Sequence, residues 1–425
     1  MATLTPAASG AVPAHGLLPR SPSFPADQWP AYDLGALGQP ADVVGRDAAL
    51  SGMVGGRSLW AFGDTIFTHA ASDGSWFRTN TGALDVPGYY PITEPLDASG
   101  ASAHQLVPFT SNEQAFNASA TDGSRYAVWP TAIITRDPDP ALVFAHRGRL
   151  LADKTFVLST MGVGLADVGA GSTQGSRRSA LLFGGEDCQW TAQFVGQDGY
   201  LYAYAGLDVP GRTNCPDRGD FQFGVARAPL ASADVKSAYR YWNGSAWSTT
   251  QASTATVVSG FGVNVAWNET LDKYLLITGI GTSSFYRTAD SPQGPWSAED
   301  QFVTGLPPSG GLGNYAWAQH PEHAGADDGV ILVSYLHMTG SDTSENRLVA
   351  VDLRAGAATA LPAYVDDVYE EFRGAPADAT GRAFWSDSLE GRDTTSAAVA
   401  RAIATSEQGR RHAVQEAFQE VLGRA

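Results

Sequence analysis

Short runs of alternating apolar and polar residues dominate the chain between about residues 43 and 355. The runs are rich in Val, Tyr, Phe, Trp and Thr and are separated by Gly, Asp, Asn and Pro, which is typical of short β-strands joined by turns. They group into five units, which are Arg57 to Thr68, Ser124 to Thr135 with Ala141 to Phe144, Gly199 to Gly206 with Phe221 to Pro229, Lys273 to Gly279 with Phe285 to Trp296, and Gly329 to Met338 with Asn346 to Leu353. This loose repeat predicts an all-β fold, a five-bladed β-propeller whose radial sheets hide their strand edges. A two-sheet sandwich is the alternative.

The character of the chain changes beyond Leu361. Between Thr394 and Ala425 the chain is rich in Ala, Glu, Gln and Arg, and apolar residues recur there at helical spacing, namely Val414, Phe418, Val421 and Leu422. We therefore expect an N-terminal extension at 1–38 that packs on the propeller, the propeller at 39–362, and a C-terminal extension at 363–425 that is helical from about 394. The final phrase, SEQGRRHAVQEAFQEVLGRA, resembles the start of a helical repeat module of secreted and surface-attached bacterial proteins. A helix that packs against the propeller is the alternative.

The composition excludes some classes of binding partner. The chain has 27 Lys and Arg against 44 Asp and Glu, a formal net charge of -17, so a nucleic-acid backbone would be repelled. No apolar run approaches the roughly 18 residues of a membrane span. The N-terminal 35 residues contain no signal peptide, although a mature exported protein would look the same, and we expect a secreted or cell-surface location. Cys188 and Cys215 are too few for a zinc cluster; a disulfide and two buried thiols are both open.

The segment from Gly45 to Thr65, GRDAALSGMVGGRSLWAFGDT, carries the strongest chemical signal. Its Gly55-Gly56 pair suits a two-residue hairpin turn with positive φ. With that turn, Val54 faces Arg57 and the same register places Asp47 directly opposite Asp64, with Cβ atoms about 5 Å apart. Like charges at that spacing destabilise a sheet, which argues for a functional role.

Two carboxyl groups so close would raise the pKa of one and leave the other ionised, which yields an acid and a nucleophile from one residue type. The spacing suits a retaining glycosidase, whose carboxyls stand about 5 to 5.5 Å apart, better than an inverting one. The alternative is that Asp64 only caps a turn. The sequence contains no nucleophile elbow, Walker loop, H-E-x-x-H or dinucleotide-binding glycine motif. We expect no cofactor, and no EF-hand-like loop supports a structural calcium ion.

Further candidates follow from the propeller expectation, since first strands would converge on a funnel that binds ligand at one mouth. Aromatic faces take apolar sugar surfaces, whereas amides and carboxylates bind hydroxyls. The candidate substrate-binding residues are Arg46, Asn80, Trp129, Asp187, Gln189, Trp190, Asn264, Gln319 and His320. Blade packing is the competing role for Trp129, a surface ion pair for Arg46 and a structural histidine for His320.

Several phrases together resemble a bacterial family of five-bladed propellers long known only as a domain of unknown function. They are G-R-D with W-A-F-G-D-T, N-T-G at Asn80, WPTAII at Trp129, YLYAYAG with FGVARAPL, RTADSPQGPWS at Arg287 and NYAWAQHPE at Asn314. The resemblance covers roughly residues 40 to 355. Members of that family include endo-D-arabinanases, which cut the D-arabinan of mycobacterial arabinogalactan and lipoarabinomannan. The resemblance implies that Asp47 and Asp64 are the catalytic pair.

The expected function is therefore that of a retaining endo-D-arabinanase, with a D-arabinan polysaccharide as substrate and no metal in the mechanism. In this interpretation Asp47 attacks the anomeric carbon and Asp64 protonates the leaving oxygen, although the reverse assignment is open. Endo and exo action are also both open. The alternatives are a non-catalytic carbohydrate-binding propeller, displayed at the surface through its C-terminal extension, and a glycosidase of another furanoside specificity.

Overall fold

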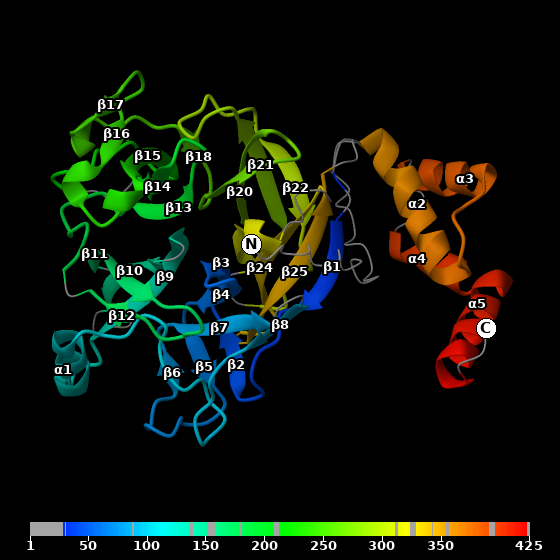
Figure 1. The fold of residues 1–425 in the computed structure, drawn as a ribbon, viewed down its shortest axis with the longest axis horizontal. Coiled ribbons are helices and arrows are strands. Elements are labelled where there is room, and N and C mark those ends of the chain that lie inside the picture. Colours follow the sequence, from blue (N-terminus) through cyan, green and yellow to red (C-terminus); the bar gives the residue numbers. More distant parts are fainter. Residues whose placement is uncertain are drawn as a thin grey trace, which may run out of the picture.

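The computed structural model describes Trp29 and residues 31–86, 89–136, 139–150, 159–178, 180–207, 212–310, 313–323, 329–341, 343–353, 357–390 and 396–422. The described chain is mostly antiparallel β-structure as far as residue 353, with one longer helix inserted, α1 (Ser111–Ser119), and it is helical after that point. Figure 1 shows the sheets following one another around a common centre, with the C-terminal helices to one side. The expectation of a mainly β protein is confirmed.

Five sheets take their strands in order along the chain. Sheet 1 contains β3 (Leu50–Val54), β4 (Arg57–Phe62), β7 (Thr81–Val86) and β8 (Tyr89–Thr93). Sheet 2 contains β9 (Arg125–Arg136), β10 (Asp139–Leu150), β11 (Ser159–Val168) and β12 (Ser176–Arg177). Sheet 3 contains β13 (Thr191–Val195), β14 (Tyr200–Gly206), β15 (Gln222–Pro229), β16 (Arg240–Trp242), β17 (Trp247–Ser248) and β18 (Val258–Ser259), the last paired with β15.

Sheet 4 contains β19 (Asn264–Asn268), β20 (Lys273–Ile280), β21 (Ser283–Ala289) and β22 (Asp300–Thr304). Sheet 5 contains β23 (Tyr315–Gln319), β24 (Val330–Met338) and β25 (Ser344–Asp352), and β1 (Ala31–Ala36) completes it. A small sheet joins β2 (Val43–Arg46), β5 (Thr65–Phe67) and β6 (Phe77–Arg78). Short 3-10 turns lie at Leu230–Ser232, Lys236–Ala238, Gln251–Ser253 and Pro321–His323.

Each seam between consecutive sheets is filled by its own cluster of buried apolar side chains. Because successive side chains of a strand point to opposite faces, Leu275 of β20 packs toward sheet 5 whereas Leu276 packs toward sheet 3. The last seam returns to the beginning of the chain, where Leu348 of β25 packs in one cluster with Trp60 of β4. Sheets that each pack on two neighbours differ from a two-sheet sandwich, so that alternative is excluded.

The first strands of these sheets contact one another in chain order, from β3 through β9, β13 and β19 to β23. The circuit continues from β23 to β3, because His320 Nδ1 lies 2.5 Å from Ser51 Oγ. The first strands therefore surround a common centre. Side chains near the beginnings of these strands come together although they lie far apart in the sequence.

The first described residues of the chain pack on the sheets. Ala31 of β1 pairs with Val351 of β25, and the Trp29 ring lies 4.6 Å from the ring of Tyr286. These residues of the predicted N-terminal extension therefore contact sheets 4 and 5, whereas 1–28 lie outside the described residues.

The helical part begins earlier than expected. Helix α2 (Ala357–Arg373) and α3 (Ala379–Glu390) precede α4 (Ser396–Ala404) and α5 (Glu407–Leu422), so the predicted start at about 394 is wrong. Pro362 lies inside α2, and a proline argues against a helix in a sequence-based prediction. The buried residues of α2, including Tyr364 and Val368, pack against α4. Val414 is exposed, and the side chains of Phe418, Val421 and Leu422 lie outside the described part.

Candidate active site

The β3–β4 hairpin has the register that the sequence predicted. Gly55 and Gly56 form its turn with φ of 58° and 80°, and Val54 pairs with Arg57. The register is kept beyond the hairpin, where Arg46 of β2 pairs with Thr65 of β5. Between these pairs the Asp47 N–H donates to the Asp64 carbonyl at 2.8 Å, and the Gly63 N–H donates to the Asp47 carbonyl at 2.6 Å. Asp47 and Asp64 therefore lie opposite each other, where sheet 1 passes into the small sheet.

Gly63 allows the Asp47 side chain to occupy its position. A Cβ added at Gly63 would lie 3.2 Å from the Asp47 Cβ and 3.4 Å from its Oδ2, which is tighter than ordinary contact. Next to Asp47, Ala48 has a positive φ of 50°, a backbone conformation that is uncommon for residues other than glycine. Local backbone strain of this kind occurs at functional sites. Because Gly63 leaves room for the Asp47 side chain, the Gly63-Asp64 phrase lets the two carboxyl groups lie close together.

A strong hydrogen bond from Trp129 holds Asp64. The Trp129 Nε1–H donates to Asp64 Oδ1 at 2.6 Å. Burial raises the pKa of Asp64 from 3.8 to about 7, against the opposing effect of the Trp129 bond; the nearby Asp47 charge adds to the rise and Arg125 opposes it. Near neutral pH a substantial fraction of Asp64 therefore carries a proton.

Asp47 has a different environment. Burial raises its pKa above the usual 3.8, although hydrogen bonds from the Tyr315 hydroxyl and the Ala48 N–H partly oppose this rise. Among the described residues its buried Oδ1 has no hydrogen-bond partner. Burial and the Asp47 charge raise the pKa of Tyr315, so that its hydroxyl remains a donor. An incompletely satisfied buried carboxylate is rare in folded proteins and calls for a functional or structural explanation.

The pair can therefore perform acid and base chemistry together. Asp64 is a carboxyl group that holds a proton near pH 7, and Asp47 is a neighbouring carboxyl group with two donors directed at it. Carboxyl groups whose environments differ in this way can act as acid and nucleophile or base in one reaction. Both residues are only partly exposed, so the protein shields most of each side chain from water.

Two predicted site residues support the backbone near the pair. Arg46 is 1% exposed, binds Glu94 at 2.8 Å and lies over the Phe62 ring, so it is neither a partner of Asp47 nor part of a surface ion pair. Asn80 is fully buried, and its side chain bonds the backbone of Val107 and Val128.

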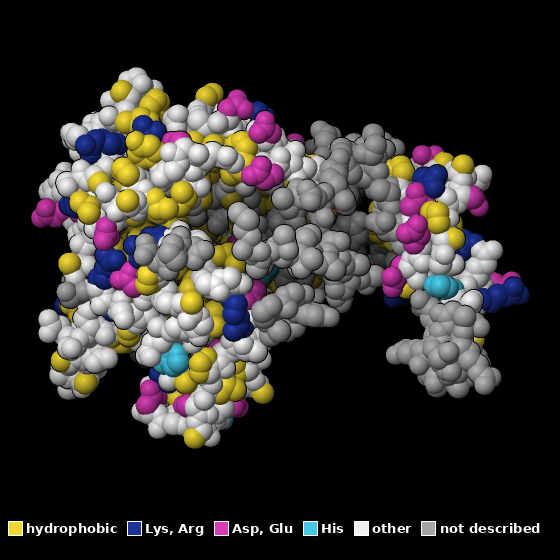
Figure 2. All heavy atoms as spheres, viewed as in Figure 1, with side chains coloured by type: hydrophobic (Ala, Val, Ile, Leu, Met, Phe, Trp, Pro, Cys, Tyr) yellow, Lys and Arg dark blue, Asp and Glu magenta, His cyan; other side chains and the backbone are white. Residues whose placement is uncertain are grey.

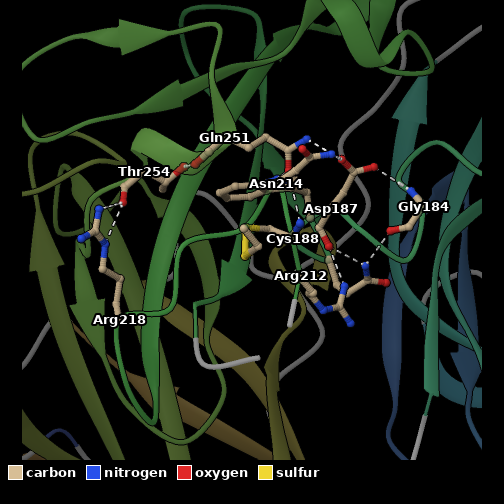
Figure 3. The surroundings of a disulfide bond; sticks show 11 residues. Gly184, Asp187, Cys188, Arg212, Asn214, Arg218, Gln251 and Thr254 are labelled. Carbon is tan, nitrogen blue, oxygen red and sulfur yellow. Dashed lines mark hydrogen bonds between the residues drawn. A yellow bond between two sulfur atoms is a disulfide. The ribbon is translucent and has the colours of Figure 1, made fainter. Parts of the chain in front are cut away.

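Three other candidates, Asp187, Gln189 and Trp190, lie together just before the first strand of sheet 3 (Figure 3). Asp187 is 2% exposed and accepts bonds from Lys236, Asn214, Gln251 and the Gly184 N–H. Although burial would raise it, these bonds lower the pKa of Asp187. Gln189 and Trp190 are buried beside it, and the Trp190 indole donates to Gln251. Their bonds are internal to the protein, and the structure does not bring them into contact with Asp47 or Asp64.

The structure also resolves the cysteine question. Cys188 and Cys215 form a disulfide with Cα atoms 4.8 Å apart. The bridge joins the two loops that supply Asp187 and Asn214 (Figure 3). A cavity of about 660 Å³ borders this network and is lined by Asp187, Asn214, Lys236, Ser237, Tyr239, Tyr241, Thr249, Thr250, Gln251 and Ala252.

The remaining candidates, Asn264, Gln319 and His320, form hydrogen bonds between the first strands of neighbouring sheets. Asn264 of β19 accepts bonds from the backbone and side chain of Gln319. His320 is fully buried between the hydroxyls of Ser51 and Ser334, and burial lowers its pKa well below 6.5. His320 is therefore a neutral structural histidine, and it does not contact either carboxylate.

Sequence reasoning did not select Tyr315 or Arg125. Tyr315 stands in the NYAWAQHPE phrase, next to residues that were selected, but its contact with Asp47 depends on the neighbouring positions of β23 and β3. Arg125 is exposed and lies over the Phe77 ring at 4.8 Å. No local pattern signals either role.

Residues 38–335 match the family model described as Domain of unknown function (DUF4185). The chain belongs to the DUF4185 family. The crystal structure of a "putative hydrolase" from Bacteroides ovatus ATCC 8483 is similar to this DUF4185 protein with a TM-score of 0.56 at 14% identity, over 79% of this chain and 93% of that chain. This likeness concerns the fold.

Two further solved structures are more distantly similar to the DUF4185 protein. A GH43_1 enzyme from Xanthomonas citri has a TM-score of 0.45 at 12% identity, covering 74% of this chain and 89% of that chain. An α-L-arabinofuranosidase from Podospora anserina, in complex with cellotriose, has a TM-score of 0.43 at 14% identity, covering 79% and 99%. No curated protein matches the sequence.

Three further observations concern metal-binding groups, helices and surface charge in the DUF4185 protein. Among the described residues, no three His, Cys, Asp or Glu side chains gather where they could hold a metal ion. Within the same part of the chain, the helices are too short or too polar to cross a membrane. On the face drawn in Figure 2, basic and acidic side chains are interspersed over the sheets and over the helices.

Proposed function

We propose that this DUF4185 protein is a glycoside hydrolase in which Asp47 and Asp64 are the catalytic pair and the five sheets are the blades of a five-bladed propeller. The observation that carries the proposal is the opposition of the two carboxyl groups across paired strands, each with its own donor. Trp129 binds Asp64, and Tyr315 binds Asp47. Two neighbouring carboxyl groups, one of which holds a proton near neutral pH, are what glycosidic bond cleavage requires.

In the proposed mechanism Asp64 is the acid and base. Its raised pKa keeps a proton available for the leaving oxygen, and loss of that proton to the leaving group makes Asp64 a base for water in the second step. Asp47 attacks the anomeric carbon as the leaving oxygen departs and forms a glycosyl ester, which the activated water then hydrolyses with release of Asp47. The Tyr315 and Ala48 donors stabilise Asp47 in its charged form. This double displacement retains the configuration of the sugar.

The proposed substrate is a D-arabinan, cleaved at internal α-D-arabinofuranosyl bonds. It rests on the resemblance of the sequence phrases to a family that includes endo-D-arabinanases. The net charge of -17 favours a neutral glycan over an anionic polymer. We further propose that the protein acts outside the cytoplasm, since the Cys188–Cys215 disulfide suits an oxidising compartment. Surface attachment through the C-terminal helices is part of the same proposal.

The test is product analysis with purified mycobacterial arabinogalactan. The wild type and an Asp290→Asn control, whose carboxylate is 86% exposed in a pair with Lys273, should release short D-arabinose oligomers. Asp47→Asn and Asp64→Asn should each lose at least a hundredfold in turnover, the usual contribution of a positioned acid or base. Binding without release by the wild type would instead indicate a carbohydrate-binding propeller. If the wild type neither binds nor cleaves the polymer, D-arabinan is refuted as the substrate.

Two further measurements separate the roles and the stereochemistry. With an activated aryl leaving group, which needs no proton, Asp64→Asn should keep its first step, and added azide should restore turnover. Neither the activated leaving group nor added azide should restore turnover in Asp47→Asn. Proton NMR of the first product should show the anomeric configuration of the substrate, and the opposite configuration would refute the double displacement.

A further inference from the structure

Two exposed aromatic side chains lie together at the seam between sheets 3 and 4, and a third apolar residue is exposed at the nearby end of β20. Phe221, just before β15, is 50% exposed, and Phe261, in the loop between β18 and β19, is 45% exposed. Their rings are 5.6 Å apart. Ile280, at the end of β20, is 44% exposed. Single exposed apolar residues are common on protein surfaces, but a pair of exposed rings drawn from two separate segments is not.

The backbone holds these side chains in place. Phe221 has a φ of 58°, which is strained for a bulky residue, and its carbonyl accepts a bond from the Gly260 N–H at 3.1 Å. Thr278 Oγ1 donates to the Phe261 carbonyl at 3.1 Å. A Cβ at Gly260 would lie 2.9 Å from Thr278 Oγ1, so only glycine lets the loop approach β20 this closely. Strain retained by such contacts directs attention to function.

The cluster lies on the same side of the molecule as the two carboxylates. Gln319 of β23 binds Asn264 of β19. Asn264 pairs with Ile277 of β20, so the loop that carries Phe261 lies at the same end of sheet 4 as Ile280. A backbone bond from Gly281 to Asn314 independently brings the end of β20 beside the start of β23.

Ile280 is next to Gly281, and Tyr315 is next to Asn314 and hydrogen-bonds Asp47. The apolar surface thus continues from Phe221 through Phe261 and Ile280 to the edge of the site. We infer that Phe221 and Phe261 form an aromatic platform that binds sugar units of the glycan several positions away from the cleaved bond. This inference rests on the proposed function and adds a distal subsite for a polymeric, uncharged chain.

Sugar rings fit such a platform because their C–H faces are apolar, whereas their hydroxyls remain in water. No charged partner is required, which matches a neutral glycan. A platform beyond the cleavage site contributes only to substrates long enough to reach it. Its signature is therefore dependence on chain length, which neither general destabilisation nor damage to the carboxylates would produce.

The experiment compares Phe221→Gly, Phe261→Ala and the double variant with Phe384→Ala, a control whose ring is 58% exposed in helix α3. Glycine is used at position 221 because it accepts the positive φ. For arabinogalactan, each single variant should raise KM roughly three- to tenfold, the size of one aromatic stacking contact, with kcat unchanged. For the shortest oligomer that the wild type cleaves, KM should change less than about twofold. The control should match the wild type.

Equal losses on both substrates, or no loss on either, would overturn the platform while leaving hydrolysis established. If the wild type does not hydrolyse the polymer, affinity electrophoresis of Asp47→Asn against arabinogalactan tests binding directly. Binding weakened by the two platform substitutions would support the platform without catalysis, and unchanged binding would overturn it. A wild type that neither binds nor cleaves overturns both proposals. Sedimentation that shows a dimer dissociated by these substitutions would assign the surface to a second copy of the chain instead.

Discussion

Replacing Trp129 by phenylalanine should move the pH dependence of turnover in a known direction. The indole donates to Asp64 at 2.6 Å and is the main effect opposing the rise of the Asp64 pKa to about 7. A hydrogen bond to a charged group contributes about 1.5 to 3 kcal/mol, and one pKa unit corresponds to about 1.4 kcal/mol. Loss of the indole should therefore raise the pKa of Asp64 by roughly one to two units.

The sign follows from the role assigned to Asp64. If Asp64 must be protonated in the free enzyme, kcat/KM falls as pH rises through about 7. In Trp129→Phe the same fall should come at about 8 to 9. The assay is kcat/KM from pH 4 to 10 on one oligomer. The control is Trp267→Phe, since Trp267 Nε1 has no hydrogen-bond partner among the described residues.

An alkaline limb that stays near pH 7 in Trp129→Phe would refute the role of the indole. Activity that rises through pH 7 in the wild type would refute the assignment of Asp64 as the acid and make it the base or nucleophile. A second readout needs no substrate. The indole N–H resonance of Trp129 should titrate near pH 7 in the wild type and should not titrate in Asp64→Asn.

The remaining predictions concern stability and neighbouring groups. The folded-state pKa of Asp64 lies above the unfolded value of 3.8, so ionisation of Asp64 destabilises the fold as pH rises from about 4 toward 7. Asp64→Asn should therefore raise the free energy of unfolding at pH 8 by at most about 4 kcal/mol, with no gain below pH 4. Equal stability of the wild type and the variant at pH 8 would contradict this. Tyr315→Phe removes a donor to Asp47 and should shift the acidic limb of kcat/KM upward by roughly one unit, so an unmoved limb would exclude this role. Gly63→Ala brings a methyl group 3.2 Å from the Asp47 Cβ and should lower kcat/KM about tenfold or more with a native circular dichroism spectrum, whereas full activity would show that Asp47 has room to move. Asp187→Asn should lower the free energy of unfolding by about 1 to 3 kcal/mol without changing kcat, because the bonds of Asp187 are internal; a selective rise in KM would restore it as a substrate-binding residue.

The sequence was most informative where structure depends on near neighbours. Gly55 and Gly56 determine the hairpin, the hairpin determines the register, and the register brings Asp47 opposite Asp64. The alternation of apolar residues likewise predicted a chain of antiparallel sheets. Each of these inferences uses residues that are close together in the chain.

The sequence was least informative where the outcome depends on which distant strands become neighbours. Tyr315 reaches Asp47 only because β23 and β3 lie side by side. Asp187 and His320 have the residue types of a binding site, but internal donors and hydroxyls already satisfy them. Composition shows that such groups are present and cannot show whether the fold has already used their hydrogen bonds.

The pairing of β1 with β25 affects how the chain folds during synthesis. Ala31 finds its partner only when Val351 has been made, so the first strand waits while nearly all of the sheet region leaves the ribosome. Contacts of such sequence separation make folding slow and leave strand edges exposed meanwhile. A fragment that begins after Ala36 would expose the nine-residue edge of β25, which invites aggregation. Expression of this protein should therefore depend on an unobstructed first strand as well as on the five sheets.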